Sequence, residues 1–118
     1  MNKKLLEVQC NIGVAQRLIR GKWKVAILFF LADRTWRFNE LHRAMPDIQQ
    51  AYLTKQLRDL EKDGLIHREI YKEVPPRVEY SLTDIGQGFV PIIRAMETWG
   101  GQYVDKIKAM EEEQASAE

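Results

Sequence analysis

Apolar residues near the start of the chain recur every three or four positions, which is the spacing of one face of an amphipathic helix. This face consists of Leu5, Val8, Ile12, Ala15 and Ile19. Gly21 follows it, and glycine is common directly after the last turn of a helix. The pattern therefore predicts a helix over residues 5–20. A second helix is predicted over residues 22–32, and because that stretch is apolar on nearly all sides, we expect it to be buried.

The middle of the chain predicts two helices joined by a short turn. After a short extended piece at residues 36–38, Asn39 is a suitable N-cap for a brief helix that Pro46 brings to an end. A longer helix begins at Asp47 or Gln49 and ends at Gly64. Its apolar side is formed by Leu53, Leu57 and Leu60. So few residues join the two helices that we expect a helix-turn-helix corner.

Two strands are predicted after this corner. Residues 66–72 are rich in β-branched and aromatic side chains, and apolar and polar positions alternate over residues 78–82. Between the strands lies the segment Glu73–Pro76, whose two prolines belong at a hairpin tip because proline cannot donate to a strand ladder. Lys72 and Arg77 flank this tip. The order of helices followed by a basic-tipped hairpin is that of a winged helix-turn-helix domain.

A long final helix is predicted after Thr83, which is a suitable N-cap. Its apolar stripe steps by three and four, through Ile85, Phe89, Ile92, Met96, Trp99, Tyr103, Ile107 and Met110. Such a helix measures roughly 40 Å, whereas a compact domain of this size has a radius of gyration of about 13 Å. We therefore expect part of the stripe to lack cover within one chain. Pro91 and the pair Gly100-Gly101 should disturb the helix, and the acidic tail at residues 111–118 should fray.

Composition and charge favour a single globular domain and argue against a membrane protein. A chain of 118 residues with 45% hydrophobic content suits one globular domain. The longest apolar run spans residues 25–32, far short of the roughly 20 residues of a membrane span, and no apolar leader follows the N-terminal lysines, so we expect a cytoplasmic protein. Residues 1–80 carry 15 basic and 10 acidic side chains, and residues 81–118 carry 3 and 7. This asymmetry suits a protein that presents one face to a polyanion, although chance also gives differences of this size.

Four motifs in register resemble the HxlR-type transcriptional regulators, which are relatives of the MarR regulators. The motifs are Gly21-Lys22-Trp23, Arg37–Leu41, Leu53–Leu65 and Val74–Thr83, within a match over roughly residues 7–101. The resemblance implies a mainly α fold with a small antiparallel β-hairpin, in which a homodimeric winged-helix protein binds operator DNA. The common family pattern has a proline directly after the cysteine, where this chain has Asn11. It also has a serine at the start of the recognition helix, where this chain has Gln49.

The resemblance implies a division of labour within a single domain over residues 1–118. Residues 22–82 form the DNA-binding core, and the helices at 5–20 and 83–110 form the dimer interface. The interface residues expected on the last helix are Ile92, Met96, Trp99 and Tyr103.

The outward face of the helix that ends at Gly64 holds the candidate DNA contacts. Its base-edge candidates are Gln50, Ala51, Thr54 and Lys55, because recognition helices read bases with their N-terminal half. Arg58, with Lys72 and Arg77 of the hairpin tip, suits phosphate contacts. The alternative for this face is an ordinary solvated helix surface.

Cys10 is the single cysteine, so it has no partner for a disulfide within the chain. Two interpretations stand: a thiol that senses oxidants or electrophiles, as in some relatives, or a small apolar residue near the dimer interface. His42 and His67 are ordinary polar residues in our interpretation, and no metal or cofactor is expected.

The sequence contains no phosphate-binding glycine loop and no metalloprotease motif, so we expect no enzyme activity. The predicted function is sequence-specific binding of double-stranded DNA by a homodimeric transcriptional regulator. The alternative is a winged-helix module that binds proteins and not DNA.

Overall fold

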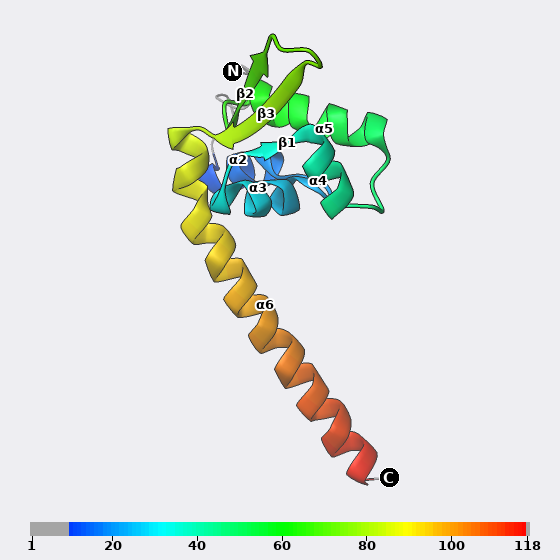
Figure 1. Ribbon diagram of the computed structural model, residues 1–118. Coiled ribbons are helices and arrows are strands. Elements are labelled where there is room, and N and C mark those ends of the chain that lie inside the picture. The colour runs from blue at the N-terminus through cyan, green and yellow to red at the C-terminus, as the bar shows by residue number, and fades with distance from the viewer. Residues whose placement is uncertain (1–9, 118) are drawn as a thin grey trace.

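The computed structural model describes residues 10–117 of the chain, and its elements are labelled in Figure 1. Within that range they are α2 (Asn11–Leu18), α3 (Lys24–Asp33), β1 (Trp36–Arg37), α4 (Phe38–Ala44), α5 (Gln50–Lys62), β2 (Ile66–Tyr71), β3 (Arg77–Leu82) and α6 (Asp84–Ala117). Helices dominate and the small sheet is antiparallel, which confirms the predicted winged helix-turn-helix fold.

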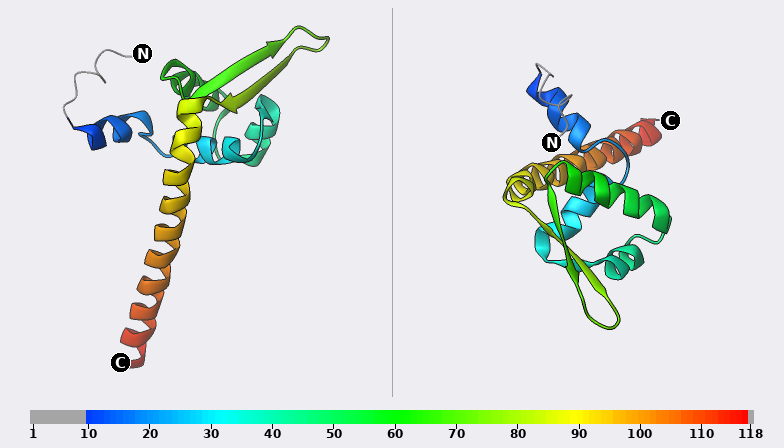
Figure 2. Two further views of the ribbon diagram at one scale, coloured as in Figure 1. Left: turned by 90° about the vertical axis from the view of Figure 1, so that its left-hand side faces the viewer. Right: turned by 90° about the horizontal axis from the view of Figure 1, so that it is seen from above.

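The sheet has three strands in the order β1-β3-β2, so β3 lies in the middle. The hairpin pairs Ile66 with Leu82 at its base and Tyr71 with Arg77 near its tip. The short extended piece that the sequence predicts joins the other edge of β3, where Arg37 faces Glu79. The hairpin projects from the body beyond the end of β1 and forms the wing, as both views in Figure 2 show.

The core fills the space between α3, α4, α5 and the sheet. Its fully buried side chains include members of the apolar second helix and all three residues of the predicted apolar side of α5, together with Leu41 and Ile66, for which no buried face was predicted. They are Ile27, Leu28, Leu31, Leu41, Leu53, Leu57, Leu60 and Ile66. Burial of each such side chain contributes about 1.5–3 kcal/mol, so these residues fix α5 on the body with its opposite side facing solvent.

Several helix boundaries differ from those predicted. Asn39 does not cap α4: the helix begins at Phe38, and the Glu40 carboxylate accepts a hydrogen bond of 2.9 Å from the backbone N–H of Arg37. For α5 the N-cap is Gln49 and not Asp47, and the Gln49 side chain makes no capping hydrogen bond. The first predicted helix is described only from Asn11, so the part expected over residues 5–9 lies outside the described residues.

Thr83 caps α6 as predicted. Its hydroxyl oxygen accepts a 3.1 Å hydrogen bond from the backbone N–H of Gly86 and donates one of 2.6 Å to the carbonyl of Gly64. Glycine is required at position 86, since a Cβ there would overlap the Leu65 carbonyl oxygen. The start of α6 is therefore fastened directly to the end of α5.

α6 is one continuous helix of 34 residues that includes Pro91 and both central glycines. The expectation of a frayed tail from residue 111 is wrong, because the helix continues to Ala117. Good helix formers explain the extension, since Glu, Gln and Ala fill these last turns. The radius of gyration is 17.9 Å, larger than the roughly 13 Å of a compact domain, because α6 extends far beyond the body (Figure 1).

Candidate nucleic-acid interface

The turn between α4 and α5 is anchored in the core by two apolar side chains, Met45 and Ile48, which are 4% and 2% exposed. The backbone N–H of Ile48 donates to the Met45 carbonyl at 3.2 Å, and the His42 Nε2 lies 3.2 Å from the Ile48 carbonyl oxygen. His42 thus takes part in the turn. The anchored turn fixes the orientation of α5 relative to α4 and the core.

The side of α5 that faces away from the core carries the predicted base-edge candidates. Gln50, Ala51 and Lys55 are exposed, and Arg58 continues the same surface toward the end of the helix. Thr54 is half-buried, and its hydroxyl donates to the Gln50 carbonyl at 3.0 Å. Thr54 therefore offers an outside partner its methyl group and oxygen lone pairs, while the amide of Gln50 can both donate and accept.

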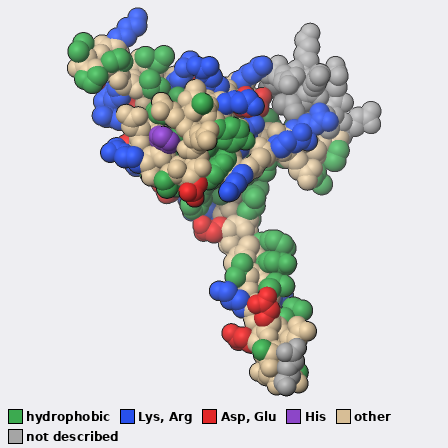
Figure 3. All heavy atoms as spheres, turned by 90° about the vertical axis from the view of Figure 1, so that its right-hand side faces the viewer, with side chains coloured by type: hydrophobic (Ala, Val, Ile, Leu, Met, Phe, Trp, Pro, Cys, Tyr) green, Lys and Arg blue, Asp and Glu red, His purple; other side chains and the backbone are tan. Residues whose placement is uncertain are grey.

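Lysine and arginine side chains are spread over the body in the space-filling view, and hydrophobic side chains follow the projecting α6 (Figure 3). On the wing, Lys72 is exposed. Val74 at the tip is also exposed. The hairpin thus extends a basic and apolar tip beyond the body.

Arg77 differs from Lys72, because its guanidinium is held within the wing. Its Nη2 lies 3.2 Å from Glu73 Oε1, and its Nε lies 3.4 Å from Glu79 Oε2. The group also lies over the Tyr71 ring, 4.1 Å from the centroid. With its side chain only 26% exposed, Arg77 stiffens the wing as well as adding positive charge to it.

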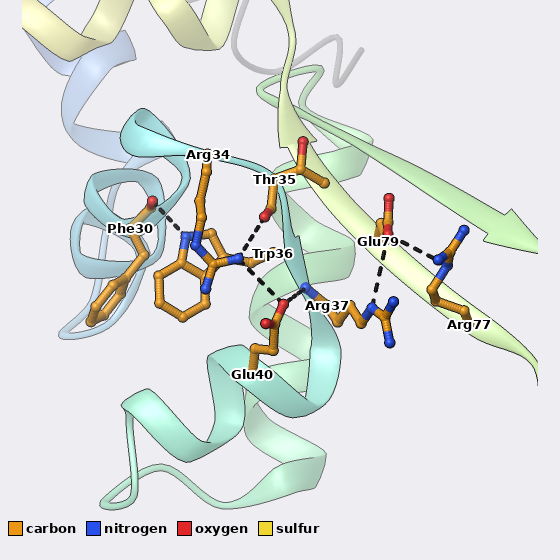
Figure 4. A network of polar contacts seen from close by, with 8 residues as sticks. All are labelled: Phe30, Arg34, Thr35, Trp36, Arg37, Glu40, Arg77 and Glu79. Atoms are coloured by element: carbon orange, nitrogen blue, oxygen red, sulfur yellow. Dashed lines mark hydrogen bonds and ion pairs between the residues drawn. The ribbon is translucent and has the colours of Figure 1, made fainter.

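A polar network joins the base of the wing to the helix-turn-helix unit (Figure 4). Glu79 Oε2 lies 3.9 Å from the Nε of Arg37, which stands at the junction of β1 and α4. One residue earlier, the Trp36 indole N–H donates to the Phe30 carbonyl at 2.9 Å. The Arg34 guanidinium covers the Trp36 ring at 3.7 Å. This network connects α3, β1, α4 and β3.

Glu40 belongs to the same network. The backbone N–H of Arg37 donates to its carboxylate, and the Arg34 guanidinium lies 3.3 Å from it. Together they hold the pKa of this carboxyl below its usual value, mainly through the backbone hydrogen bond. The ionised form of Glu40 therefore stabilises the start of α4.

The apolar stripe of α6 is open to solvent where the sequence predicts a partner. Ile92, Met96, Trp99 and Tyr103 are between 44% and 65% exposed. The Trp99 and Tyr103 rings stack with their centroids 5.6 Å apart. A hollow of about 370 Å³ beside the stripe is lined by Phe29, Ile93 and Met96 among others. The four residues thus form one continuous uncovered surface.

Cys10 is exposed and stands at the N-cap of α2, with extended backbone geometry. Over residues 10–117 no cluster of three or more His, Cys, Asp or Glu side chains could hold a metal ion. Within the same range no helix is long and apolar enough to cross a membrane.

Sequence reasoning did not find Arg37, Glu79 or Glu40 as parts of the site. The spacing of Glu40 three residues after Arg37 is a capping signal that could have been noticed. The pairing of Arg37 with Glu79 has no such signal, because it depends on a two-residue strand joining β3 from a distant part of the chain.

Comparison with known proteins agrees with this geometry. The profile of the HxlR-like helix-turn-helix family matches residues 18–108. The chain belongs to this family. The helix-turn-helix-type transcriptional regulator YdeP of Bacillus subtilis is 49% identical over 102 residues, which are 86% of this chain and 80% of that protein. A regulator of the same type from Methanothermobacter thermautotrophicus is 50% identical over 97 residues, or 82% of this chain and 74% of that one.

Solved structures of redox and transcriptional regulators are also similar to this chain. The redox regulator HypR in its reduced form has a TM-score of 0.80 and 43% identity, and the match covers 85% of this chain and 99% of that one. The reduced transcriptional regulator YodB of Bacillus subtilis has a TM-score of 0.71 and 29% identity, with 82% and 97% covered. The winged-helix architecture is therefore shared with transcriptional regulators.

Proposed function

We propose that this HxlR-like chain is a transcriptional regulator that binds specific sequences of double-stranded DNA as a homodimer. The observation that carries the proposal is the exposed α5 face, which presents an amide, a lysine and an arginine beside a basic wing. Its mechanism is binding and not catalysis. The bacterial and archaeal origin of the relatives supports action in the cytoplasm, where the chromosome lies.

In this proposal α5 enters the major groove and its N-terminal half reads base edges. Gln50 is suited to adenine through its paired donor and acceptor, Lys55 is suited to guanine, and Ala51 or the Thr54 methyl can contact a thymine methyl. Arg58 and Lys72 are suited to phosphates, because lysine and arginine at the edges of such an interface neutralise the backbone. Arg77 completes the basic surface of the wing.

The open stripe of α6 supports the homodimer. Aromatic side chains such as Trp99 and Tyr103 are enriched at interface centres, and an uncovered row of them favours a partner with the same row. Two-fold symmetry then presents two α5 helices to half-sites about 10 base pairs apart, or a multiple of that spacing.

Titration of the purified protein against duplex DNA over a series of salt concentrations tests the proposal. Footprinting on the DNA upstream of the protein's own gene supplies the specific site, and a scrambled duplex is the control. We expect tight binding to the footprinted site. In a plot of the logarithm of the association constant against the logarithm of salt concentration, the slope should be about −0.9 for each phosphate that the protein neutralises. A winged-helix module that binds only proteins would give neither a footprint nor this slope, and such a result refutes the proposal.

We also propose that DNA binding responds to oxidants or electrophiles through Cys10. The exposed position of this thiol and the likeness to the redox regulator HypR support the idea. Since each chain holds one cysteine, a protein disulfide must join two chains, and the other route is modification by a small thiol or electrophile. Diamide treatment should release DNA from the wild type and leave the Cys10→Ser variant bound. An equal response of both proteins excludes the Cys10 switch.

A further inference from the structure

Two glutamates hold the Arg77 guanidinium in different ways. Glu73 lies at the wing tip, contacts Nη2 at 3.2 Å and has a side chain that is 52% exposed. Glu79 lies in the middle strand, contacts Nε at 3.4 Å and is only 21% exposed. The exposed ion pair is worth little in water, whereas the shielded one is held in place by the sheet around it.

Glu79 also reaches a second arginine. It faces Arg37 in the register of β1 and β3, and its Oε2 lies 3.9 Å from the Arg37 Nε. One carboxylate therefore lies between two guanidinium groups and contacts both from the side, through Nε. Among the described residues the terminal nitrogens of Arg37 make no ion pair, and its side chain is 55% exposed.

The two arginines border the same space. Arg37, with Phe38 and Asn39 at the start of α4, forms one wall of a hollow of about 460 Å³. Arg77 and the tip prolines Pro75 and Pro76 form the other wall. The hollow thus lies between the start of α4 and the wing, and in the proposed complex we place there the DNA backbone that flanks the groove occupied by α5.

We propose that Glu79 is a positioning residue that holds Arg37 and Arg77 as a paired phosphate contact, while Glu73 occupies Arg77 until a phosphate replaces it. This inference rests on the proposed DNA binding and adds Arg37 to the contacts. A carboxylate that lies on the Nε side of a guanidinium, as Glu79 does at 3.4 Å from Arg77 and 3.9 Å from Arg37, leaves the terminal nitrogens for a phosphate once Glu73 is displaced from Arg77. Bidentate binding of phosphate needs two such nitrogens. On this basis the exposed partner competes with DNA and the shielded partner assists it.

Substitution of the two glutamates is therefore expected to change DNA affinity in opposite directions, although each substitution removes one negative charge from beside Arg77. Charge alone predicts tighter DNA binding for both variants, because a polyanion is repelled by either carboxylate. We expect Glu73→Gln to tighten binding about threefold at moderate salt. We expect Glu79→Gln to weaken it about tenfold and to lower the salt slope by about one, because an ordered phosphate contact is lost.

Salt-series titrations of wild type, Glu79→Gln, Glu73→Gln and the control Glu69→Gln on one duplex test the inference. Glu69 lies opposite Glu79 on β2, but its ion pair is with His67, at 2.8 Å. The substitution Glu69→Gln therefore removes one negative charge from the same sheet without removing an ion pair of Arg37 or Arg77. We expect Glu69→Gln to bind at least as tightly as wild type.

Three outcomes would overturn the inference while leaving the proposed function intact. One is tighter binding by Glu79→Gln, equal to that of Glu73→Gln, and another is unchanged binding by both. The third is weaker binding by Glu79→Gln with an unchanged salt slope, because a lower fraction of folded protein has that effect. A wild type that shows no salt-dependent binding to any duplex would overturn the proposed function and this inference together.

Discussion

Substitution of Trp99 by alanine should separate the two subunits of the proposed dimer. The side chain lies on the open stripe of α6 and stacks on Tyr103. α6 leads away from the body that carries α5 (Figure 1). Loss of this side chain should therefore leave each domain folded and reduce operator binding only through the loss of dimer. One α5 helix on one half-site binds much more weakly than two joined helices.

The expected size follows from the exposure of the side chain. Trp99 is 65% exposed in the single chain, and with up to about 250 Å² in a tryptophan this leaves about 160 Å² open to a partner. Cover over half of that area contributes about 2 kcal/mol per subunit at about 25 cal/mol per Å². A two-fold axis repeats the contact, so the dimer loses about 4 kcal/mol and its dissociation constant rises about a thousandfold.

Sedimentation over a range of protein concentrations measures this change. The matched control is Val104→Ala, which removes an exposed apolar group from the same helix, roughly 100° from the centre of the stripe at about 100° per residue. We expect the control to dimerise nearly as the wild type does. The reasoning is refuted if the wild type is monomeric at micromolar concentration, or if both variants dissociate equally.

Further predictions concern reading, folding and pH. Gln50→Ala should lower affinity for the specific duplex by about 1–3 kcal/mol and hardly affect scrambled DNA, whereas Arg58→Ala should weaken both and lower the salt slope by about one; titrations on the two duplexes distinguish them. Gly86→Ala should destabilise the fold by about 1–3 kcal/mol, because its Cβ meets the carbonyl that precedes β2, while Gly88→Ala, with open space around it, should stabilise the helix by up to about 1 kcal/mol; urea unfolding shows whether the signs differ. The pKa of Glu40 in the folded protein lies below its ordinary value of 4.5, so its contribution to stability is complete above pH 4.5 and is lost as pH falls through the folded pKa. Glu40→Gln should therefore make the free energy of unfolding fall less steeply with decreasing pH in the acid range, which urea unfolding at a series of pH values measures.

The sequence predicted the structure best where a local pattern of residues has only one stable arrangement. The apolar sides of α3 and α5 could be predicted because a helix must bury its hydrophobic face, and the wing because prolines exclude a strand interior. The cap at Thr83 also followed from residue type, and its partner atoms confirm it. The exposed face of α5 then followed from the buried one.

The errors arose where local and tertiary effects compete. Asn39 has a better cap side chain than Arg37, but the extended backbone of β1 and the Glu40 carboxylate set the start of α4 two residues earlier. The fraying expected after residue 110 gave too little weight to helix propensity in the last turns. Arg77 looks like a free cation in the sequence, and only the sheet register places Glu79 beside it.

The hydroxyl of Thr83 has a mechanical consequence for any dimer built on α6. It ties the first turn of that helix to the carbonyl of Gly64, where α5 has just ended, so the two helices move as a single lever. Half-sites about 34 Å apart place each α5 about 17 Å from the two-fold axis. A rotation of about 10° per subunit then displaces each reading helix by about 3 Å, close to the rise of one base pair. An effector that tilts the paired α6 helices by that small angle would put both helices out of step with the grooves without touching either of them.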